Sequence, residues 1–310
     1  PVLPPSVSGL LRFLSLIRRN IMTMRQVKQI YSAPNPHWVG NGFSMSTVFS
    51  YKENAEQYSP FLLMDYAEPT LFKPVTNARG VGTHPHRGFE TVTIAYQGEV
   101  SHHDSTGHAG TIAEGDVQWM TAASGILHKE YHSEKMTKEG GMLEVVQLWV
   151  NLPSAYKMAQ PRYQALKAQD IPHVQLPNAQ GYVRVIAGDY ANTSGVAMTY
   201  SPLNLWDVRL NHAGTSHYAI PEGHNAMLFV VKGAIHLNNS DIVRQHEIAI
   251  LDTHGDTLTL GSMGDAIVLI LTGEPINEPV VGQGPFVMNT QQELLQAFDD
   301  YDNGKFGMMD

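Results

Sequence analysis

Two short segments decide the fold: His84-Pro85-His86-Arg87-Gly88-Phe89-Glu90 and Ile126-Leu127-His128-Lys129-Glu130. Each segment has two potential metal ligands two residues apart, His84 with His86 and His128 with Glu130. Side chains at positions i and i+2 of a β-strand point to the same face. If the two strands lie side by side inside a barrel, three imidazoles and one carboxylate meet at one point. Such a set binds a divalent transition metal and leaves positions open for further ligands.

The residues around these segments have the composition of strands and turns. Residues 91–96 are β-branched and aromatic, and the Gln97-Gly98-Glu99 sequence that follows is typical of a turn. Residues 116–120 form a second strand-like run. Ala123-Ser124-Gly125 permits a tight backbone turn just before His128. The flanks therefore favour a β-structure that holds both segments.

The order of these motifs resembles the two-part motif of the cupin superfamily of small β-barrels. The residues within and around these motifs resemble one branch of that superfamily, the pirin family, more closely still. The segments that carry this resemblance are HPHRGFET (84–91), GDVQWMTAASGILH (115–128), LWVNLP (148–153), TGEP (272–275) and GPFVMNT (284–290). The likeness runs from about Arg25 to the C-terminus, which is nearly the whole chain.

Two positions depart from the general cupin pattern. That pattern expects Asn four residues after the second-motif His, where this chain has His132, and it usually takes its fourth ligand from the first-motif Glu, here Glu90. In pirin-like proteins the carboxylate ligand stands two residues after the second-motif His, at Glu130. The resemblance therefore implies a ligand set composed of His84, His86, His128 and Glu130.

Other polar residues near the motifs are candidates for orienting the ligands. Arg87 and Glu90 are nearest in sequence, and Gln118 lies on a neighbouring predicted strand. For Arg87 the alternative is an ion pair that lies at the surface or stabilises the fold. We interpret three histidines of the turn-rich segment 101–110 as exposed loop residues or polar neighbours of the ligands: His102, His103 and His108.

The second half of the chain repeats the shape of the first half without its ligands. After Pro177, strand-like runs return between turns, as in an antiparallel barrel. Residues 230–233 resemble residues 95–98, and counting back from Gly233 identifies the counterparts of His84, His86 and Glu90 as Ala219, Pro221 and Asn225. We expect this second barrel to pack against the first and to bind no metal through these positions.

The predicted fold class is all-β: two antiparallel cupin-type β-barrels packed together, with a short C-terminal α-helix. We place the first, metal-binding barrel at residues 25–164 and the second barrel with the terminal helix at residues 165–310. Residues 45–51 are the clearest early strand. Thr290 and Glu293 form a capping box for the C-terminal helix, whose apolar stripe is expected to dock on a barrel.

Residues 1–24 differ in composition from the rest. Residues 1–21 contain three arginines, no acidic residue and an interrupted apolar run, so this segment is a disordered extension or a leader. The chain has no cysteine, which excludes disulfides and thiolate metal sites and suits the cytoplasm. A net charge of −9 argues against direct nucleic-acid binding. No apolar run reaches the ~20 residues that span a bilayer, and we expect a monomer.

Three neutral imidazoles and one carboxylate around a divalent ion leave a site with a net positive charge, which favours an anionic substrate oxygen. Iron(II), manganese, nickel, copper and zinc all tolerate this ligand set. The pirin resemblance favours Fe(2+). Glu130 is the candidate base, because a ligating carboxylate beside an open position can reach a substrate hydroxyl.

The resemblance implies quercetin 2,3-dioxygenase activity, in which a metal-chelated flavonol is cleaved by O2 with release of carbon monoxide. One alternative is an iron-dependent regulator without catalysis, which binds a transcription factor or a metabolic enzyme; that alternative rests on family resemblance alone. Another is a different cupin chemistry, because substrate choice depends on the pocket wall and not on the ligands.

Overall fold

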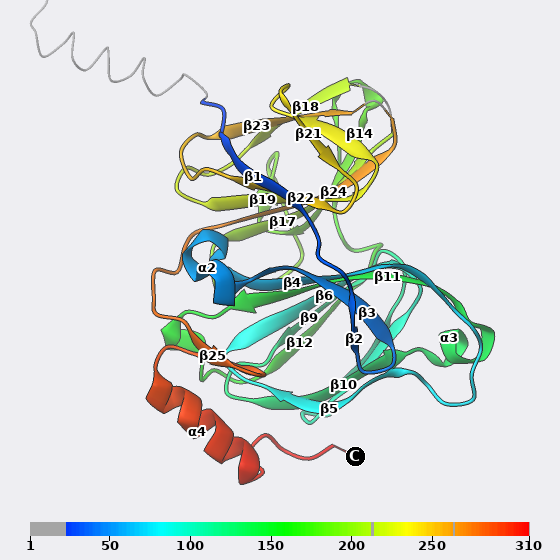
Figure 1. Ribbon diagram of the computed structural model, residues 1–310, viewed down its shortest axis with the longest axis vertical. Coiled ribbons are helices and arrows are strands. Elements are labelled where there is room, and N and C mark those ends of the chain that lie inside the picture. Colours follow the sequence, from blue (N-terminus) through cyan, green and yellow to red (C-terminus); the bar gives the residue numbers. More distant parts are fainter. Residues whose placement is uncertain (1–22, 212–213, 263, 310) are drawn as a thin grey trace, which may run out of the picture.

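The computed structural model describes residues 23–211, 214–262 and 264–309. The predicted extension at residues 1–24 lies outside this range except for its last two residues. The described chain forms two halves of the same design, each with one seven-stranded and one four-stranded sheet (Figure 1). Strand pairs in all four sheets are antiparallel. The predicted all-β class with two similar barrels is therefore confirmed.

The two sheets of the first half face each other around a shared interior. In spatial order the larger sheet contains β12 (Arg162–Leu166), β9 (Val117–Thr121), β6 (Phe89–Gln97), β11 (Gly141–Asn151), β4 (Phe61–Phe72), β3 (Phe43–Ser50) and β2 (His37–Val39). The smaller sheet contains β5 (Gly80–His86), β10 (Ile126–His132), β7 (Val100–Asp104) and β8 (Ala109–Ile112).

The second half repeats this arrangement. Its larger sheet contains β1 (Val27–Ser32), β22 (Glu247–Leu251), β19 (Asn225–Lys232), β24 (Ala266–Gly273), β17 (Leu203–Leu210), β14 (Gly181–Ala187) and β13 (His173–Gln175). Its smaller sheet contains β18 (Gly214–Ala219), β23 (Thr257–Ser262), β20 (Ala234–Leu237) and β21 (Asp241–Arg244). Two hairpins, β15–β16 (Asp189–Tyr190 and Thr193–Ser194) and β25–β26 (Val281–Gln283 and Phe286–Met288), complete the strands.

Two strands bear on the predicted domain division. β1 belongs by sequence to the first predicted domain, but it pairs with β22 in the second half. β12 spans the predicted boundary at Gln164 and pairs with β9 of the first half. The boundaries at residues 24 and 164 stay predictions.

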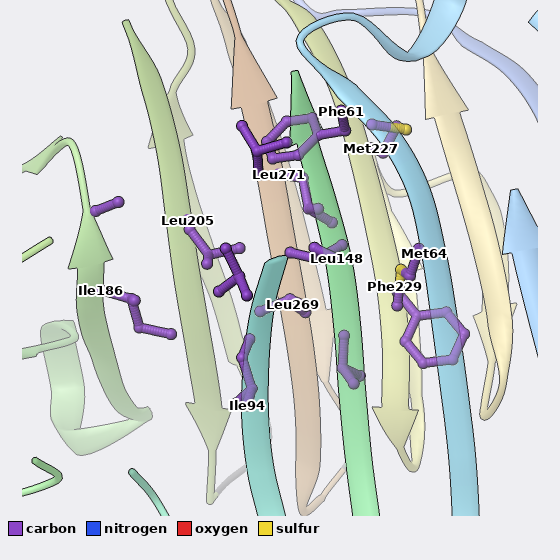
Figure 2. Packing of buried hydrophobic residues seen from close by; sticks show 14 of the residues in the cluster. Phe61, Met64, Ile94, Leu148, Ile186, Leu205, Met227, Phe229, Leu269 and Leu271 are labelled. Atoms are coloured by element: carbon purple, nitrogen blue, oxygen red, sulfur yellow. The ribbon is translucent and has the colours of Figure 1, made fainter. Parts of the chain in front are cut away.

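The two larger sheets pack face to face and bury one apolar cluster between the halves. Figure 2 shows its members from the first half, Phe61, Met64, Ile94 and Leu148, against Ile186, Leu205, Met227, Phe229, Leu269 and Leu271 from the second. All ten side chains are fully buried. This contact confirms that the second barrel packs against the first, and it leaves the smaller sheet of the first half on the far side.

The helices are short: α2 (Tyr51–Tyr58), α3 (Glu134–Glu139), α4 (Gln291–Asp302) and two 3-10 turns (Ser154–Tyr156 and Pro177–Ala179). The predicted strand at residues 45–51 ends one residue early, because the Ser50 hydroxyl accepts a hydrogen bond from Lys52 N and starts α2. The Thr290–Glu293 capping box of α4 is confirmed. In the part of the chain that the structure describes, no helix is both long and apolar enough to cross a membrane.

Candidate metal centre

The two segments that carry the predicted ligands lie on adjacent strands, β5 and β10. These strands pair antiparallel, with His128 directly opposite His84. The register then slips, so that Glu130 faces Val81 and β5 accommodates one extra residue. A bulge of this kind bends a strand and changes where its side chains point.

The structure brings three of the four predicted ligands together: His84, His86 and His128. One ligand atom from each of these residues lies within 4.8 Å of the other two. Their ring centroids are 4.2 Å apart for His84 and His128, 4.8 Å for His86 and His128, and 4.9 Å for His84 and His86. The i, i+2 spacing on β5 and the pairing of β5 with β10 produce this group.

All three imidazoles use Nδ1 for a contact inside the protein. The Nδ1 atoms of His84 and His86 lie 2.8 Å from Gly82 O and 3.4 Å from Pro285 O, and Nδ1 of His128 lies 3.4 Å from Nδ1 of His102. Nε2 of His128 is buried and has no hydrogen-bond partner among the described residues. The Nε2 atoms are therefore the ones available to a metal.

Burial keeps two of these rings neutral. The pKa of His86 lies well below the usual value because of burial and then of the neighbouring His84. Burial, followed by the nearby His86, His84 and His102, likewise holds the pKa of His128 well below its usual range. Neutral imidazole is the form that binds metals. The buried, unpartnered Nε2 of His128 also fits a metal, because a buried polar atom without a partner is costly unless something binds it.

Glu130 points into the interior of the first half from the same strand as His128, but it lies outside the three-histidine group. Its carboxylate accepts hydrogen bonds from Gln118 (3.1 Å), Gln147 (2.9 Å) and Thr93 (3.4 Å). Gln118, one of the residues expected to orient the ligands, therefore contacts the predicted carboxylate ligand directly. The position of Glu130 leaves its binding of a metal as a proposal.

His102, which the sequence suggested as a loop residue, lies next to the three-histidine group. It lies on β7, not in a loop, and is fully buried. Its Nε2 lies 2.9 Å from Oδ2 of Asp104, and its ring stacks on Tyr163 at a centroid distance of 4.9 Å. His103 also lies on β7 and is partly buried, so it is not an exposed loop residue either, whereas His108 is exposed as predicted. The exposed-loop interpretation of His102 is wrong, and the polar-neighbour interpretation is right.

Glu90 does not orient the ligands. On β6 it shares a face with Val92 and Ile94, which pack in the cluster between the two halves, whereas Thr93 on the other face reaches Glu130. The Glu90 carboxylate accepts a hydrogen bond from Thr121 at 2.6 Å. The predicted role was wrong because strand alternation directs this side chain away from the barrel interior.

Replacing Glu90 by Gln will flatten the pH dependence of stability. Burial raises the pKa of Glu90 from 4.5 to about 7, against the hydrogen bond from Thr121 and the influence of the nearby Trp119 and Arg162, which lower it. Because the folded protein holds this proton more tightly, the contribution of Glu90 to stability is full below pH 4.5 and is lost as pH rises through about 7. Urea unfolding across this pH range will show that the free energy of unfolding falls less with rising pH in Glu90→Gln than in the wild type. The exposed Glu56→Gln should keep the wild-type slope, and an unchanged slope in Glu90→Gln would contradict the assignment.

Arg87 forms a buried ion pair, the alternative noted from the sequence. Its Nη1 donates to Asp300 of α4 at 2.7 Å and its Nε donates to Ser124 O at 2.7 Å. The guanidinium also lies 4.6 Å from the centroid of the Phe306 ring. This pair ties the C-terminal helix to the first metal motif, and Figure 1 shows α4 beside the first half, although the chain arrives from the second.

Replacing Asp300 by Ala will lower the free energy of unfolding by about 3 kcal/mol, because it leaves the Arg87 guanidinium buried without a carboxylate. Lys305 and Arg87 hold the pKa of Asp300 well below its usual range, so the group is ionised at neutral pH. Urea denaturation measures the change. Asp302→Ala, at an exposed position of the same helix, should change stability by less than about 0.5 kcal/mol. Equal losses in both variants would show that the ion pair is unimportant.

The C-terminal segment also holds the ligand strand through its backbone. Arg87 N donates to Pro285 O, and Val287 N donates to Arg87 O at 3.1 Å. Gly88 has φ +88°, and a Cβ there would lie 2.0 Å from Val287 O. Only glycine permits this close approach. Residues 285–306 therefore form an arm across the end of the first half that carries the three histidines.

Comparison with known proteins agrees with this architecture. Residues 42–150 match the Pirin family model, and residues 205–307 match the model of the Pirin C-terminal cupin domain. A Pseudomonas aeruginosa protein named "Putative quercetin 2,3-dioxygenase" is 53% identical over 283 residues, which cover 91% of this chain and 99% of its own. The chain belongs to the pirin family. A pirin-like protein of Solanum lycopersicum is 40% identical over 81% of this chain and 83% of its own.

A solved structure extends the likeness to three dimensions. The crystal structure described as quercetin 2,3-dioxygenase from Acinetobacter baumannii is 49% identical to this pirin. It covers 92% of this chain and 99% of its own, with a TM-score of 0.89. Together with the two family models, this agreement confirms a pirin fold made of two cupin domains.

Among the described residues of the second half there is no counterpart of the histidine group. Within the described ranges, the three-histidine group of the first half is the only cluster of its kind. Ala219 and Pro221, the counterparts of His84 and His86, instead line a cavity of about 690 Å³. The second barrel keeps the shape of the first. That it binds no metal stays a prediction.

Several residues around the site were not found from the sequence. Asp104 and Tyr163 contact His102, which in turn contacts His128. Pro285 contacts His86 from 199 residues away. Pro285 lies within a motif that carried the pirin resemblance, which is the only signal that pointed to it. Asp104 carried no signal, because an acidic residue in a turn-rich segment is common.

Proposed function

We propose that this pirin is a flavonol (quercetin) 2,3-dioxygenase that acts through a divalent metal held by His84, His86, His128 and Glu130. The observation that carries the proposal is the convergence of three imidazoles whose Nδ1 atoms are all engaged and whose Nε2 atoms are free. The names of the Pseudomonas relative and of the Acinetobacter structure support this activity.

Each group in the site has a part in this proposal. A divalent ion bound there supplies a Lewis acid for the flavonol oxygen and access to O2 chemistry. His84, His86 and His128 hold the ion, and Glu130 takes the proton of the flavonol 3-hydroxyl. Gln118, Gln147 and Thr93 hold the Glu130 carboxylate in place through three hydrogen bonds.

The metal and the setting are part of the same proposal. Iron(II) is the expected ion, since the pirin resemblance favours it, although manganese, nickel, copper or zinc suit the same ligands. We further propose that the protein works as a cytoplasmic monomer, which its cysteine-free sequence suits. The net charge of −9 supports a small-molecule substrate in preference to nucleic acid.

The test combines metal analysis with an oxygen assay. Protein purified without added metal is analysed for bound ions and then mixed with iron(II) and quercetin, and O2 uptake and carbon monoxide release are followed. His84→Ala should fall to the rate of free iron. His217→Ala, at an exposed histidine of the second half, should match the wild type.

Turnover at the free-metal rate in the wild type would reject the dioxygenase function. It would favour an iron-dependent regulator that binds a protein partner. Metal-dependent turnover of another ring compound, with none of quercetin, would favour a different cupin chemistry in the same site.

A further inference from the structure

The three histidines of the metal centre differ in what holds their Nδ1 atoms. His84 and His86 contact backbone carbonyl oxygens. A carbonyl oxygen only accepts hydrogen bonds, so each of these rings carries its proton on Nδ1 and leaves Nε2 free. His128 instead contacts a second imidazole, that of His102. An imidazole can donate or accept, so this contact alone does not decide which nitrogen of His128 carries the proton.

Asp104 removes this ambiguity. Its Oδ2 lies 2.9 Å from Nε2 of His102, and both side chains are completely buried. An ionised carboxylate only accepts, and hydrogen bonds from His102 and Thr106 hold the pKa of Asp104 down to about 2 against the effect of burial. Nε2 of His102 is therefore the donor. In the neutral ring Nδ1 of His102 is then an acceptor, so Nδ1 of His128 must donate to it.

We propose that Asp104 and His102 are positioning residues that select the His128 tautomer with Nδ1 protonated and Nε2 free to bind a metal. This inference rests on the proposed metal function of His128. The centroids of the His102 and His128 rings are 5.4 Å apart, so the two imidazoles are direct neighbours.

Further contacts fix the positions of both Asp104 and His102. Oδ1 of Asp104 accepts hydrogen bonds from Thr106 N (2.9 Å), Thr106 Oγ1 (2.6 Å) and His108 N (3.3 Å). The two carboxylate oxygens thus have separate tasks: Oδ1 holds the turn and Oδ2 holds His102. Tyr163 stacks on His102 with an angle of 14° between the ring planes, which restricts rotation of the imidazole.

This division of tasks makes Asp104→Asn a sharp test. The asparagine can keep its Oδ1 on the Thr106 turn and then presents an N–H to Nε2 of His102. His102 must accept there, donate from Nδ1 to His128, and move the proton of His128 to Nε2. The turn is preserved while every hydrogen bond in the chain is reversed, so metal-free His128 should change tautomer.

The first measurement is the tautomer of His128 in metal-free protein, from two-bond ¹H–¹⁵N spectra of histidine-labelled samples. We expect Nδ1–H in the wild type and Nε2–H in Asp104→Asn. The second measurement is nickel(II) affinity by chelator competition, which should fall by about 10- to 100-fold in Asp104→Asn. Thr106→Val, which weakens the turn and leaves the contact between Asp104 and His102, should keep both wild-type results.

His102→Gln is the second variant. Its amide N–H can donate to Asp104 while its oxygen accepts from Nδ1 of His128, so it should retain the wild-type tautomer and bind nickel more tightly than Asp104→Asn. The inference is overturned if wild-type His128 carries its proton on Nε2, or if Asp104→Asn keeps the wild-type tautomer and affinity. A wild type that binds nickel with the expected tautomer but does not turn over quercetin rejects the dioxygenase function and leaves this inference intact.

Discussion

Replacing His128 by Ala will abolish specific metal binding. We expect affinity for nickel(II) or iron(II) to fall by roughly 1000-fold or more, beyond the loss of 10- to 100-fold expected for a group that only orients a ligand. The reason is geometric: His128 faces His84 across the β5–β10 pair and supplies the most deeply buried nitrogen of the group. Because a ligand of the folded state raises its stability, added nickel should raise the melting temperature of the wild type and not that of the variant.

A matched control separates metal binding from general loss of stability. His132 is a second buried histidine of β10, and its Nε2 contacts Gly42 O at 2.8 Å, away from the metal centre. His132→Ala should lower stability through this lost hydrogen bond and still show the nickel-induced rise in melting temperature. A His128→Ala protein that binds nickel as tightly as His132→Ala would contradict the proposed ligand set.

Replacing Glu130 by Gln will reduce turnover far more than metal content. If Glu130 is the base, the turnover per bound metal should fall by about 100-fold or more, because an amide cannot take the flavonol proton. The site can accept the glutamine with little rearrangement. Its oxygen can keep the hydrogen bonds from Gln118 and Thr93, and a flip of the Gln147 amide can restore the third contact. Metal analysis and quercetin-dependent O2 uptake on the same sample measure the two effects.

Thr93→Val is the control for this substitution, since it removes one hydrogen bond to Glu130 and leaves the carboxylate. Its turnover per metal should stay within about tenfold of the wild type, because only one 3.4 Å hydrogen bond to the carboxylate is lost and those from Gln118 and Gln147 remain. If metal content and turnover fall together in Glu130→Gln, the lost turnover follows from the lost metal, and Glu130 is not the base.

The core of the candidate site could be predicted because its spacing is local. His84 and His86 share a face of β5 through strand alternation alone, and the same rule directs His128 and Glu130 to one side of β10. The capping box at Thr290 was also predictable, since it involves residues three apart. The short helix α2 was not predicted, because its N-cap Ser50 lies at the end of a segment whose pattern indicates a strand.

Glu90 and His102 show where local rules stop. Glu90 follows the same alternation as its neighbours, but only the packing of the two larger sheets makes its face the interface between the halves. His102 lies in a segment whose composition suggests a turn, and its burial depends on the pairing of β7 with β10. Periodicity tells which residues share a face, and tertiary packing decides what that face meets.

The sequence by itself determined the all-β class, the two similar barrels and which histidines meet. Only the tertiary structure showed that residues 285–306 cross back to the first half, where Pro285 O meets His86 and Asp300 pairs with Arg87. The physical reason is the sequence separation over which each interaction acts. Strand alternation and helix caps act over two to four residues, whereas these contacts join residues 199 and 213 positions apart, whose meeting depends on how the whole chain packs.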